Sequence, residues 1–198
     1  MSPEEMIKNS PIAALIADPH SEDTPIIACN DAFLELTGYE REEVIGRNCR
    51  FLAGPDTEPW QSQRMRIAIR ERRPVQVELL NYRKDGSTFR NAVLIAPIFD
   101  ADGRIEWFLG SQVEVPEDGR DGEANGHRVQ SARTRFAAAS PRQREILVKM
   151  AEGKLNKQIA FELGLSERTI KMHRSALFRA LGVRTAAEAI RIAIEAGH

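Results

Sequence analysis

Cys49 has the most distinctive chemical surroundings in the sequence, because it lies between the amide of Asn48 and the guanidinium of Arg50. An isolated cysteine is usually a small buried residue, and Cys29, which lies in an apolar stretch, fits that interpretation. A guanidinium carries a permanent charge and pairs bidentately with phosphate. The segment around Cys49 is therefore a candidate for a thiol site beside an anion-binding group.

Three carboxamides, those of Asn81, Asn91 and Gln112, recur on one face of the strands predicted after residue 74. Strand side chains alternate between the two faces of a sheet. These amides therefore share a surface with apolar and small residues: Val77, Leu79, Val93, Ile95, Phe108 and Gly110. A buried amide needs hydrogen-bond partners. Either the amides bond to one another and to the backbone, or they face a flat ligand with a polar edge, and the pattern does not choose between these interpretations.

Basic residues near the C-terminus form a third group, and residues 156–175 have the spacing of a helix-turn-helix. Ala160 is small where two helices would cross, Gly164 lies at the turn, and Ser166 can cap the second helix. The apolar stripe of that helix consists of Ile170, Leu177 and Leu181. The opposite side presents polar residues and a methionine to a DNA major groove: Arg168, Lys171, Met172 and Ser175. The alternative is an ordinary helical hairpin with a solvated basic face.

The net charge of −1 conceals an asymmetry along the chain. Residues 1–115 carry −6, residues 116–126 carry −3 and residues 127–198 carry +8. An acidic part joined to a basic part indicates two domains, the second facing a polyanion. The acidic, glycine-rich run 116–126 has the composition of a linker, and a connecting helix is predicted over 127–139. We therefore predict a first domain over 9–115, a linker with a connecting helix over 116–139, and a second domain over 140–198.

Composition excludes several classes of protein. With 198 residues, 42% hydrophobic and 29% charged, the chain is not a fully disordered one. Its apolar runs are far shorter than the roughly 20 residues that span a bilayer. The first ten residues lack the features of a secretory signal, so we expect a cytoplasmic protein with reduced cysteines and no membrane partner. The histidines lack metal-ligand spacing, so we expect no metal. The sequence also lacks a Ser/His/Asp set, a Walker loop and room for a kinase domain, which argues against an enzyme.

The elements that must position these residues are short strands and helices. Asn30 can cap a helix that Gly38 ends, and Asp-Gly pairs at 85–86 and 102–103 are typical of hairpin turns. The predicted strands cover 12–17, 25–29, 75–82, 88–99 and 104–115, and the predicted helices of the first domain cover 31–36 and 58–72. The pattern predicts an α+β fold, an antiparallel sheet with helices packed on one face, followed by an all-α domain.

Five motifs occur in order and at characteristic intervals: GRNCRFL, the MRIAI stretch with Arg66, the NYRKDG turn, the strand with Asn91, and the GSQVEV strand. On these motifs, residues 9–115 closely resemble the light-oxygen-voltage (LOV) family of flavin-binding blue-light sensors, a branch of the PAS fold. The resemblance implies a non-covalently bound FMN in the dark, in preference to FAD. The sequence departs from many members at Ala53, where they have glutamine, which implies that one ribityl or phosphate contact is missing.

The resemblance also implies a chemical cycle. Blue light would add the sulfur of Cys49 to flavin C4a while N5 becomes protonated, and the adduct would revert thermally in the dark. Gln112 would lie near O4 and N5 and would respond by rotating its amide. The arginines would hold the phosphate, Asn48 the ribityl chain or the ring, and the other amides the pyrimidine edge. The implied cofactor-binding residues are Asn48, Arg50, Arg66, Asn81, Asn91, Val93, Ile95, Phe108 and Gln112.

When the preceding segment SPRQREILVKMAEG is included, residues 140–197 resemble the LuxR-type four-helix DNA-binding domain. The resemblance implies a dimer through the last helix, here about 185–196. In the helix-turn-helix, the implied phosphate contacts come from the start of the first helix and from Arg168 and Arg174. The implied base contacts come from the second helix. The implied DNA-binding residues are Asn156, Lys157, Arg168, Lys171, Met172, Arg174 and Ser175.

Together the two resemblances predict a blue-light-regulated transcription factor that is a monomer in the dark and binds double-stranded DNA as a homodimer when lit. The rival hypothesis is a flavin-based redox or ligand sensor that controls DNA binding without light.

The strand alternation also predicts an outer sheet face too apolar to remain in water: Leu80, Ala92, Leu94, Ala96, Trp107, Leu109 and Val113. The last helix has an apolar face that needs a partner in a monomer: Ala187, Ile190 and Ile194. We expect each to cover the other in the dark, which would block dimerisation. Alternatively, the connecting helix or a constitutive sensor dimer covers the sheet.

Overall fold

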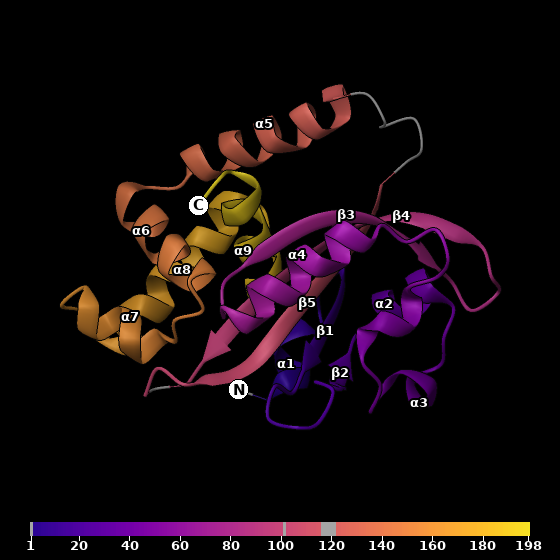
Figure 1. Cartoon of the computed structure of the whole chain (residues 1–198). Helices are drawn as coiled ribbons and strands as arrows, with labels where there is room; N and C mark the ends of the chain where they lie inside the picture. Colours follow the sequence, from indigo (N-terminus) through magenta and orange to yellow (C-terminus); the bar gives the residue numbers. More distant parts are fainter. Residues whose placement is uncertain (1, 101, 116–121) are drawn as a thin grey trace.

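The N-terminal domain is built on one antiparallel sheet (Figure 1). The structure, a computed structural model, describes residues 2–100, 102–115 and 122–198. The strands lie in the order β2-β1-β5-β4-β3. They are β1 (Ala13–Ala17), β2 (Ile26–Cys29), β3 (Val75–Tyr82), β4 (Thr88–Phe99) and β5 (Ile105–Val115). The predicted α+β fold is confirmed, and each predicted strand end lies within one residue of the observed end.

Four helical segments pack on one face of this sheet. They are α2 (Asp31–Thr37), α3 (Arg41–Val44), the 3₁₀ helix η1 (Cys49–Leu52) and α4 (Pro59–Arg70). Each buries at least one apolar side chain, namely Phe33, Val44, Leu52 and Ala68. The short α3 and η1 are absent from the sequence prediction, because segments of four residues are too short to show helical periodicity.

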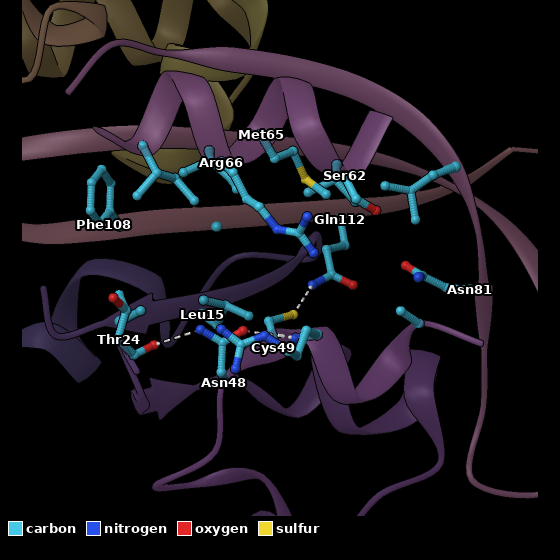
Figure 2. Close-up of a pocket in the computed structure, with 18 of the residues that line it drawn as sticks. Leu15, Thr24, Asn48, Cys49, Ser62, Met65, Arg66, Asn81, Phe108 and Gln112 are labelled. Atoms are coloured by element: carbon cyan, nitrogen blue, oxygen red, sulfur yellow. Dashed lines mark hydrogen bonds between the residues drawn. The ribbon is translucent and has the colours of Figure 1, made fainter. Parts of the chain in front are cut away.

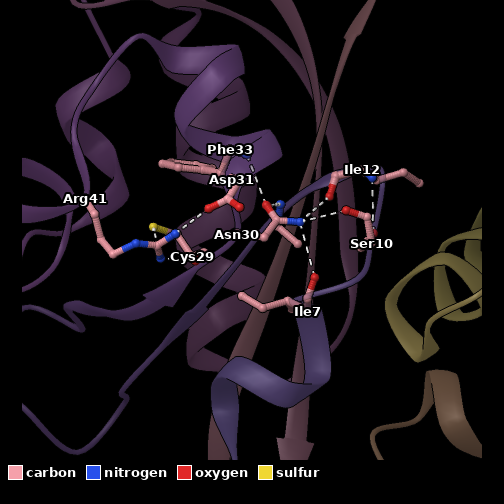
Figure 3. A network of polar contacts seen from close by, with 9 residues as sticks. Ile7, Ser10, Ile12, Cys29, Asn30, Asp31, Phe33 and Arg41 are labelled. Carbon is pink, nitrogen blue, oxygen red and sulfur yellow. Dashed lines mark hydrogen bonds and ion pairs between the residues drawn. The ribbon is translucent and has the colours of Figure 1, made fainter.

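Asn30 ties the N-terminal helix α1 (Pro3–Ile7) to the sheet and to α2 (Figure 3). Its Nδ2 donates to the carbonyl oxygens of Ile7, Ser10 and Ile12 at 3.3, 3.1 and 2.8 Å. Its Oδ1 accepts from the N–H groups of Ala14 and Phe33 at 2.9 and 3.0 Å. The second of these bonds is the predicted helix cap, and Gly38 ends α2 with a φ of 75°, also as predicted.

The connecting helix is longer than predicted. Helix α5 spans Gly122–Ala138, whereas the sequence predicted a linker over 116–126 and a helix from 127. Residues 116–121 lie outside the described residues. Glycine in a helix costs about 1 kcal/mol, but extending an existing helix adds one hydrogen bond per residue. Docking of the later half, where Ala132 and Phe136 are buried, stabilises the helix as a whole.

The C-terminal domain contains α6 (Pro141–Ala151), α7 (Asn156–Glu162), α8 (Glu167–Leu181) and α9 (Ala186–Glu195). The side chains of Ser140, Ser166 and Thr185 cap α6, α8 and α9 by accepting from backbone N–H groups. Gly164 makes the predicted turn between α7 and α8 with a φ of 63°. Among the described residues, the helices are too short or too polar to cross a membrane.

One hydrophobic core joins the two domains. It includes Leu94 and Leu109 from the outer face of the sheet, and Ile190, Leu177 and Ile146 from the helical domain. Figure 1 shows α9 lying between α5 and the sheet, in agreement with its contacts to α5 and β5. The opposite face of the sheet has separate apolar clusters with α2, α3, η1 and α4. The sheet is therefore covered on both faces.

Candidate functional sites

Cys49 begins η1, and Asn48 caps that helix. Asn48 Oδ1 accepts from the Arg50 N–H at 3.0 Å, while its Nδ2 donates to the carbonyl oxygens of Asp23 and Thr24 at 2.5 and 3.4 Å. The cap fixes where η1 starts, and thereby aims the Cys49 side chain at β5. Cys49 Sγ accepts a hydrogen bond from Gln112 Nε2 at 3.3 Å.

Cys49 is half-buried, and its thiol lies in a desolvated position beside Gln112. Burial raises the pKa of this thiol to about 11, and the hydrogen bond from Gln112 opposes the increase in part. The sulfur is therefore a protonated thiol at neutral pH, with its proton available for transfer.

The three predicted carboxamides form one hydrogen-bonded chain. Asn91 Nδ2 donates to Asn81 Oδ1 at 2.8 Å and to Gln112 Oε1 at 2.9 Å. All three side chains are buried, and Asn81 Nδ2 also donates to the Leu52 carbonyl at 3.0 Å. Among the described residues, Asn91 Oδ1 is a buried side-chain oxygen without a hydrogen-bond partner. The amides thus bond to one another, as one interpretation required, and still leave an acceptor unsatisfied.

A cavity of about 460 Å³ lies between the inner face of the sheet, η1 and α4. Figure 2 shows Met65 and Arg66 entering it from α4, Cys49 from the opposite side, and Gln112 between them. Nine of the predicted residues line it: Asn48, Cys49, Arg50, Arg66, Asn81, Val93, Ile95, Phe108 and Gln112. Asn91 does not line it and instead bonds to the two amides that do. Ala53, where the sequence departs from many LOV domains, is also in the lining.

Most of the α4 side of the cavity was missed by sequence reasoning. Besides Arg66, the helix contributes Ser62, Met65, Ile69 and Arg70. These residues have the i, i+3 and i+4 spacing of one helix face. That signal is present in the sequence, but it becomes informative only when one member of the face is known to be functional.

The predicted DNA-binding residues lie on α7 and α8, and most of them are exposed. Met172, for example, is 65% exposed, although a large apolar side chain is usually buried. The exposed members of the set are Lys157, Arg168, Lys171, Met172 and Ser175.

Arg174 and Asn156 differ from the other predicted DNA-binding residues, because they bond to each other. Arg174 Nη1 donates to Asn156 Oδ1 at 2.5 Å, and the guanidinium also lies over the ring of Phe178. Burial lowers the pKa of Arg174 from its ordinary value. In this arrangement Arg174 holds the start of α7 against α8 and does not point outward with Lys171.

The outer face of the sheet and α9 are in direct contact. The predicted docking residues Leu94, Leu109, Ala187 and Ile190 are buried in the shared core. Trp107 and Ile194 are half-buried and pack against it, whereas Val113 is half-buried and is not part of this core.

Arg191 of α9 lies in the same interface and was not predicted. Its Nη1 donates to Ser111 Oγ at 3.1 Å, and both Nη atoms donate to the Ala92 carbonyl at 3.3–3.4 Å. Arg191 also pairs with Glu195 on its own helix at 2.9 Å. Sequence reasoning missed it because a charged residue is normally assigned to the solvent side of a helix.

A second interdomain contact joins the end of β4 to the segment between α6 and α7. The Phe99 N–H donates to the Gly153 carbonyl at 3.2 Å, and Gln158 Nε2 donates to the Asp100 carbonyl at 2.8 Å. A Cβ at Gly153 would lie 2.3 Å from the Pro97 carbonyl oxygen, so only glycine allows this approach. The contact places the N-terminal domain beside the start of α7.

The linker helix α5 packs on the helical domain. Phe136 stacks on His198 with ring centroids 4.2 Å apart, and the Arg135 guanidinium donates to the Leu181 carbonyl at the end of α8. The helix therefore contacts α8 and α9 on the side away from the sheet. In the part of the chain that the structure describes, α9 and α1 pack on the outer face of the sheet, and α5 packs on α8 and α9.

The antiparallel sheet with its thiol-lined cavity and the basic helix-turn-helix are typical of a sensor domain joined to a nucleic-acid-binding domain. Residues 11–117 match the PAS domain model, and residues 138–193 match the model for bacterial regulatory proteins of the luxR family. The first match covers more than half of the chain, so the chain belongs to the PAS domain family.

Similar proteins indicate which kind of PAS domain the first domain is. Blue-light-activated histidine kinase 1 of Erythrobacter litoralis (strain HTCC2594) is 49% identical over 113 residues, which are 57% of this chain and 31% of that protein. The chain thus spans less than a third of the length of this relative. The dark structure of the Aureochrome1 LOV domain has a TM-score of 0.57 and 36% identity, covering 66% of this chain and 94% of that one.

The light-state dimer of the fungal photoreceptor Vivid has a TM-score of 0.52 and 36% identity, covering 54% of this chain and 79% of that one. The predicted resemblance is thereby confirmed. The chain combines a LOV domain with a LuxR-type helix-turn-helix domain.

Proposed function

We propose that this chain is a blue-light-regulated transcription factor in which a flavin site controls the docking of the helix-turn-helix domain. The observation that carries the proposal is the adjacency of Gln112 and Ser111 on β5. Gln112 bonds to Cys49 at 3.3 Å on the inner face of the sheet, and Ser111 bonds to Arg191 at 3.1 Å on the outer face. The proposed sensing site and the docked helix are thus separated by one peptide bond.

The cavity has the chemistry that a flavin requires. Its volume is within the roughly 300–1,000 Å³ of small-molecule sites, and apolar side chains from the sheet form one wall. Carboxamides offer both donors and acceptors to the alternating edge of the ring. Asn81 and Gln112 line the cavity, and Asn91, which we propose supports them at that edge, bonds to both. Arg50 and Arg66 line the cavity and are exposed, so they suit a phosphate at its open end. We propose FMN in preference to FAD.

The residues around the thiol would carry the light reaction. When bound, the flavin supplies an excited state whose C4a accepts a sulfur and whose N5 accepts a proton. Cys49 would provide both from one group, because its raised pKa keeps the proton on the thiol. Reversal would return the proton to Cys49 in the dark, so the cycle has no net turnover.

Gln112 would convert this local change into a change at the sheet. Its Nε2 now donates to Cys49 and its Oε1 accepts from Asn91. Beside a flavin N5 that has gained a proton, the Gln112 amide would face a donor in place of an acceptor, so a rotation that exchanges its oxygen and nitrogen would become favourable. The rotation would move β5 and disturb the bond between Ser111 and Arg191.

Release of α9 would permit dimerisation and DNA binding. In the docked arrangement Ala187 and Ile190, which form the proposed dimer face with Ile194, are buried in the core that the helical domain shares with the sheet. The start of α7, which we propose binds DNA phosphate through Lys157, lies beside Asp100 of the sensor. We propose a dark monomer, and a lit dimer that binds two half-sites. The two-domain architecture supports a cytoplasmic regulator and not an enzyme.

The experiment compares the wild-type full chain with Cys49→Ala and, as the matched control, Cys29→Ala. Absorption spectra and DNA affinity are measured in the dark and under blue light. We expect reversible bleaching and light-increased DNA affinity in the wild type and in Cys29→Ala. The Cys49→Ala variant should bind flavin and lose both responses. Reversible bleaching of Cys49→Ala, or wild-type DNA affinity that responds to chemical reduction of the flavin and not to light, would favour the rival sensor.

A further inference from the structure

Asp23 neutralises one of the arginines at the cavity. Arg50 Nη1 lies 2.5 Å from Asp23 Oδ1 and 2.6 Å from Oδ2, so both carboxylate oxygens bond to one guanidinium nitrogen. The two side chains are 62% and 53% exposed. Arg50 and Thr24 line the cavity, and Asp23 lies in an adjoining surface hollow that Arg50 and Asn48 also line.

The position of Asp23 is specified by its backbone. Asp23 and Thr24 have φ values of 68° and 49°, a region that L residues seldom adopt and that is unusual for the β-branched threonine. Asn48 holds both residues through hydrogen bonds to their carbonyl oxygens (Figure 2 shows the bond to Thr24). Asn48 also caps η1, the helix that presents Cys49 and Arg50. The same side chain therefore sets the loop that carries the carboxylate and the helix that carries the guanidinium.

The charges at the cavity are unequal in number. Arg50, Arg66 and Arg70 line it, and all three are exposed. Among the described residues, one carboxylate forms an ion pair with one of these arginines: Asp23 pairs with Arg50. Three guanidinium groups and one carboxylate leave a charge of about +2 at the opening, close to the −1.5 to −2 of a phosphate monoester.

From this we infer that Asp23 is a specificity-determining residue. Its carboxylate lowers the preference of the site for phosphorylated over unphosphorylated flavin. The inference rests on the proposed flavin site. A ligand phosphate at Arg50 shares the guanidinium with the Asp23 carboxylate, so Asp23 repels the phosphate and weakens its binding. Riboflavin has no phosphate and does not experience this repulsion.

If Asp23 served mainly to orient Arg50, removing its charge would weaken phosphate binding. The exposure of the pair argues against that role, because exposed ion pairs constrain side chains weakly. The repulsion, by contrast, acts on a ligand group with nearly two charges. Removing the carboxylate charge should therefore strengthen phosphate binding.

The test measures the affinities of FMN and riboflavin for the full chain by quenching of flavin fluorescence. The variant is Asp23→Asn, and the matched control is Glu22→Gln, which removes the same charge from the adjacent exposed residue. We expect Asp23→Asn to tighten FMN binding about three- to tenfold at an ionic strength of ~0.01 M and by less than about twofold at ~1 M, where screening is nearly complete. Riboflavin affinity should be unchanged, and the gain should disappear when Arg50→Gln is added.

The outcomes separate this inference from the function on which it rests. If the wild-type chain binds neither flavin, the proposed flavin site is wrong. If the wild type binds FMN but Asp23→Asn weakens that binding, or changes FMN and riboflavin equally, Asp23 does not set the preference. A gain of the same size in Glu22→Gln would show a general charge effect and would also overturn the assignment.

Discussion

Ser111 Oγ accepts a hydrogen bond at 3.1 Å from Arg191 Nη1, which joins the sensor sheet to an arginine that is only 4% exposed. A buried charge is stable only with well-placed partners, because its desolvation is otherwise uncompensated. Arg191 also has Glu195 and the Ala92 carbonyl. Because Ser111 is next to Gln112, the proposed movement of β5 at the thiol site would change the partners of a buried charge in the interface.

We expect Ser111→Ala to weaken the docked state. A hydrogen bond to a charged group contributes about 1.5–3 kcal/mol, so the undocked population should rise roughly 10- to 150-fold. DNA affinity in the dark should then approach the lit value. Ser87→Ala is the control, because Ser87 is exposed in the turn between β3 and β4. Dark DNA affinity that is the same in Ser111→Ala and wild type would contradict a coupling role for this bond.

Leu109→Lys should undock the helical domain more completely. Leu109 is 1% exposed in the core shared by the two domains, and an unpaired ammonium there is strongly unfavourable. We expect DNA binding in darkness and a dimeric mass by light scattering, whereas Ser87→Lys should stay monomeric and light-dependent. If Leu109→Lys and wild type are both dark dimers with light-independent DNA affinity, the docking mechanism is wrong.

The sheet could be predicted closely because its signals are local. Alternation of side chains fixes which residues share a face, and the cap at Asn30 and the turn at Gly38 mark the ends of α2. The inner face that brought Asn81, Asn91 and Gln112 together follows from the same alternation, and these three do bond to one another.

The contacts between segments could not be predicted, because they depend on tertiary placement. Nothing adjacent to Arg191 indicates that it is buried, and the pair of Asp23 with Arg50 joins a loop to a helix that are distant in sequence. Gly153 shows the same limit, because its missing side chain permits a contact with the carbonyl of Pro97, a residue distant in sequence.

The light response should not depend on pH near neutrality. Burial raises the pKa of Cys49 to about 11, so the thiol stays protonated between pH 6 and 9. We expect the amplitude of reversible bleaching to be constant over that range. Unfolded cysteine titrates near ~8.5, so the contribution of this thiol to stability is present below that pH and is lost as pH rises toward 11. A bleaching amplitude that titrates between pH 7 and 9 would contradict the enclosed, protonated thiol.

Asn30→Ala should destabilise the sensor domain. Asn30 is 4% exposed and makes five hydrogen bonds to backbone groups, so its removal leaves several of them unpaired. We expect a loss of about 2–4 kcal/mol in the free energy of unfolding, because each buried unpaired group costs ~1–3 kcal/mol. Chemical denaturation measures it. Asn9→Ala, at an exposed position nearby, should change stability by less than about 0.5 kcal/mol. Equal stabilities of the two variants would contradict the role of this network.

Lys171 and Lys157 should affect DNA binding differently. Lys171 is exposed on α8 and occupies a position implied to face bases, so Lys171→Ala should weaken specific binding by about 1–3 kcal/mol and relax preference at one base pair. Lys157 is exposed at the start of α7, where a phosphate contact is expected, so Lys157→Ala should weaken binding to all sequences and reduce the salt slope by about one. Affinity of the lit protein is measured against salt for a specific and a random duplex. Equal effects of both substitutions on both duplexes would show that the two lysines do not have separate roles.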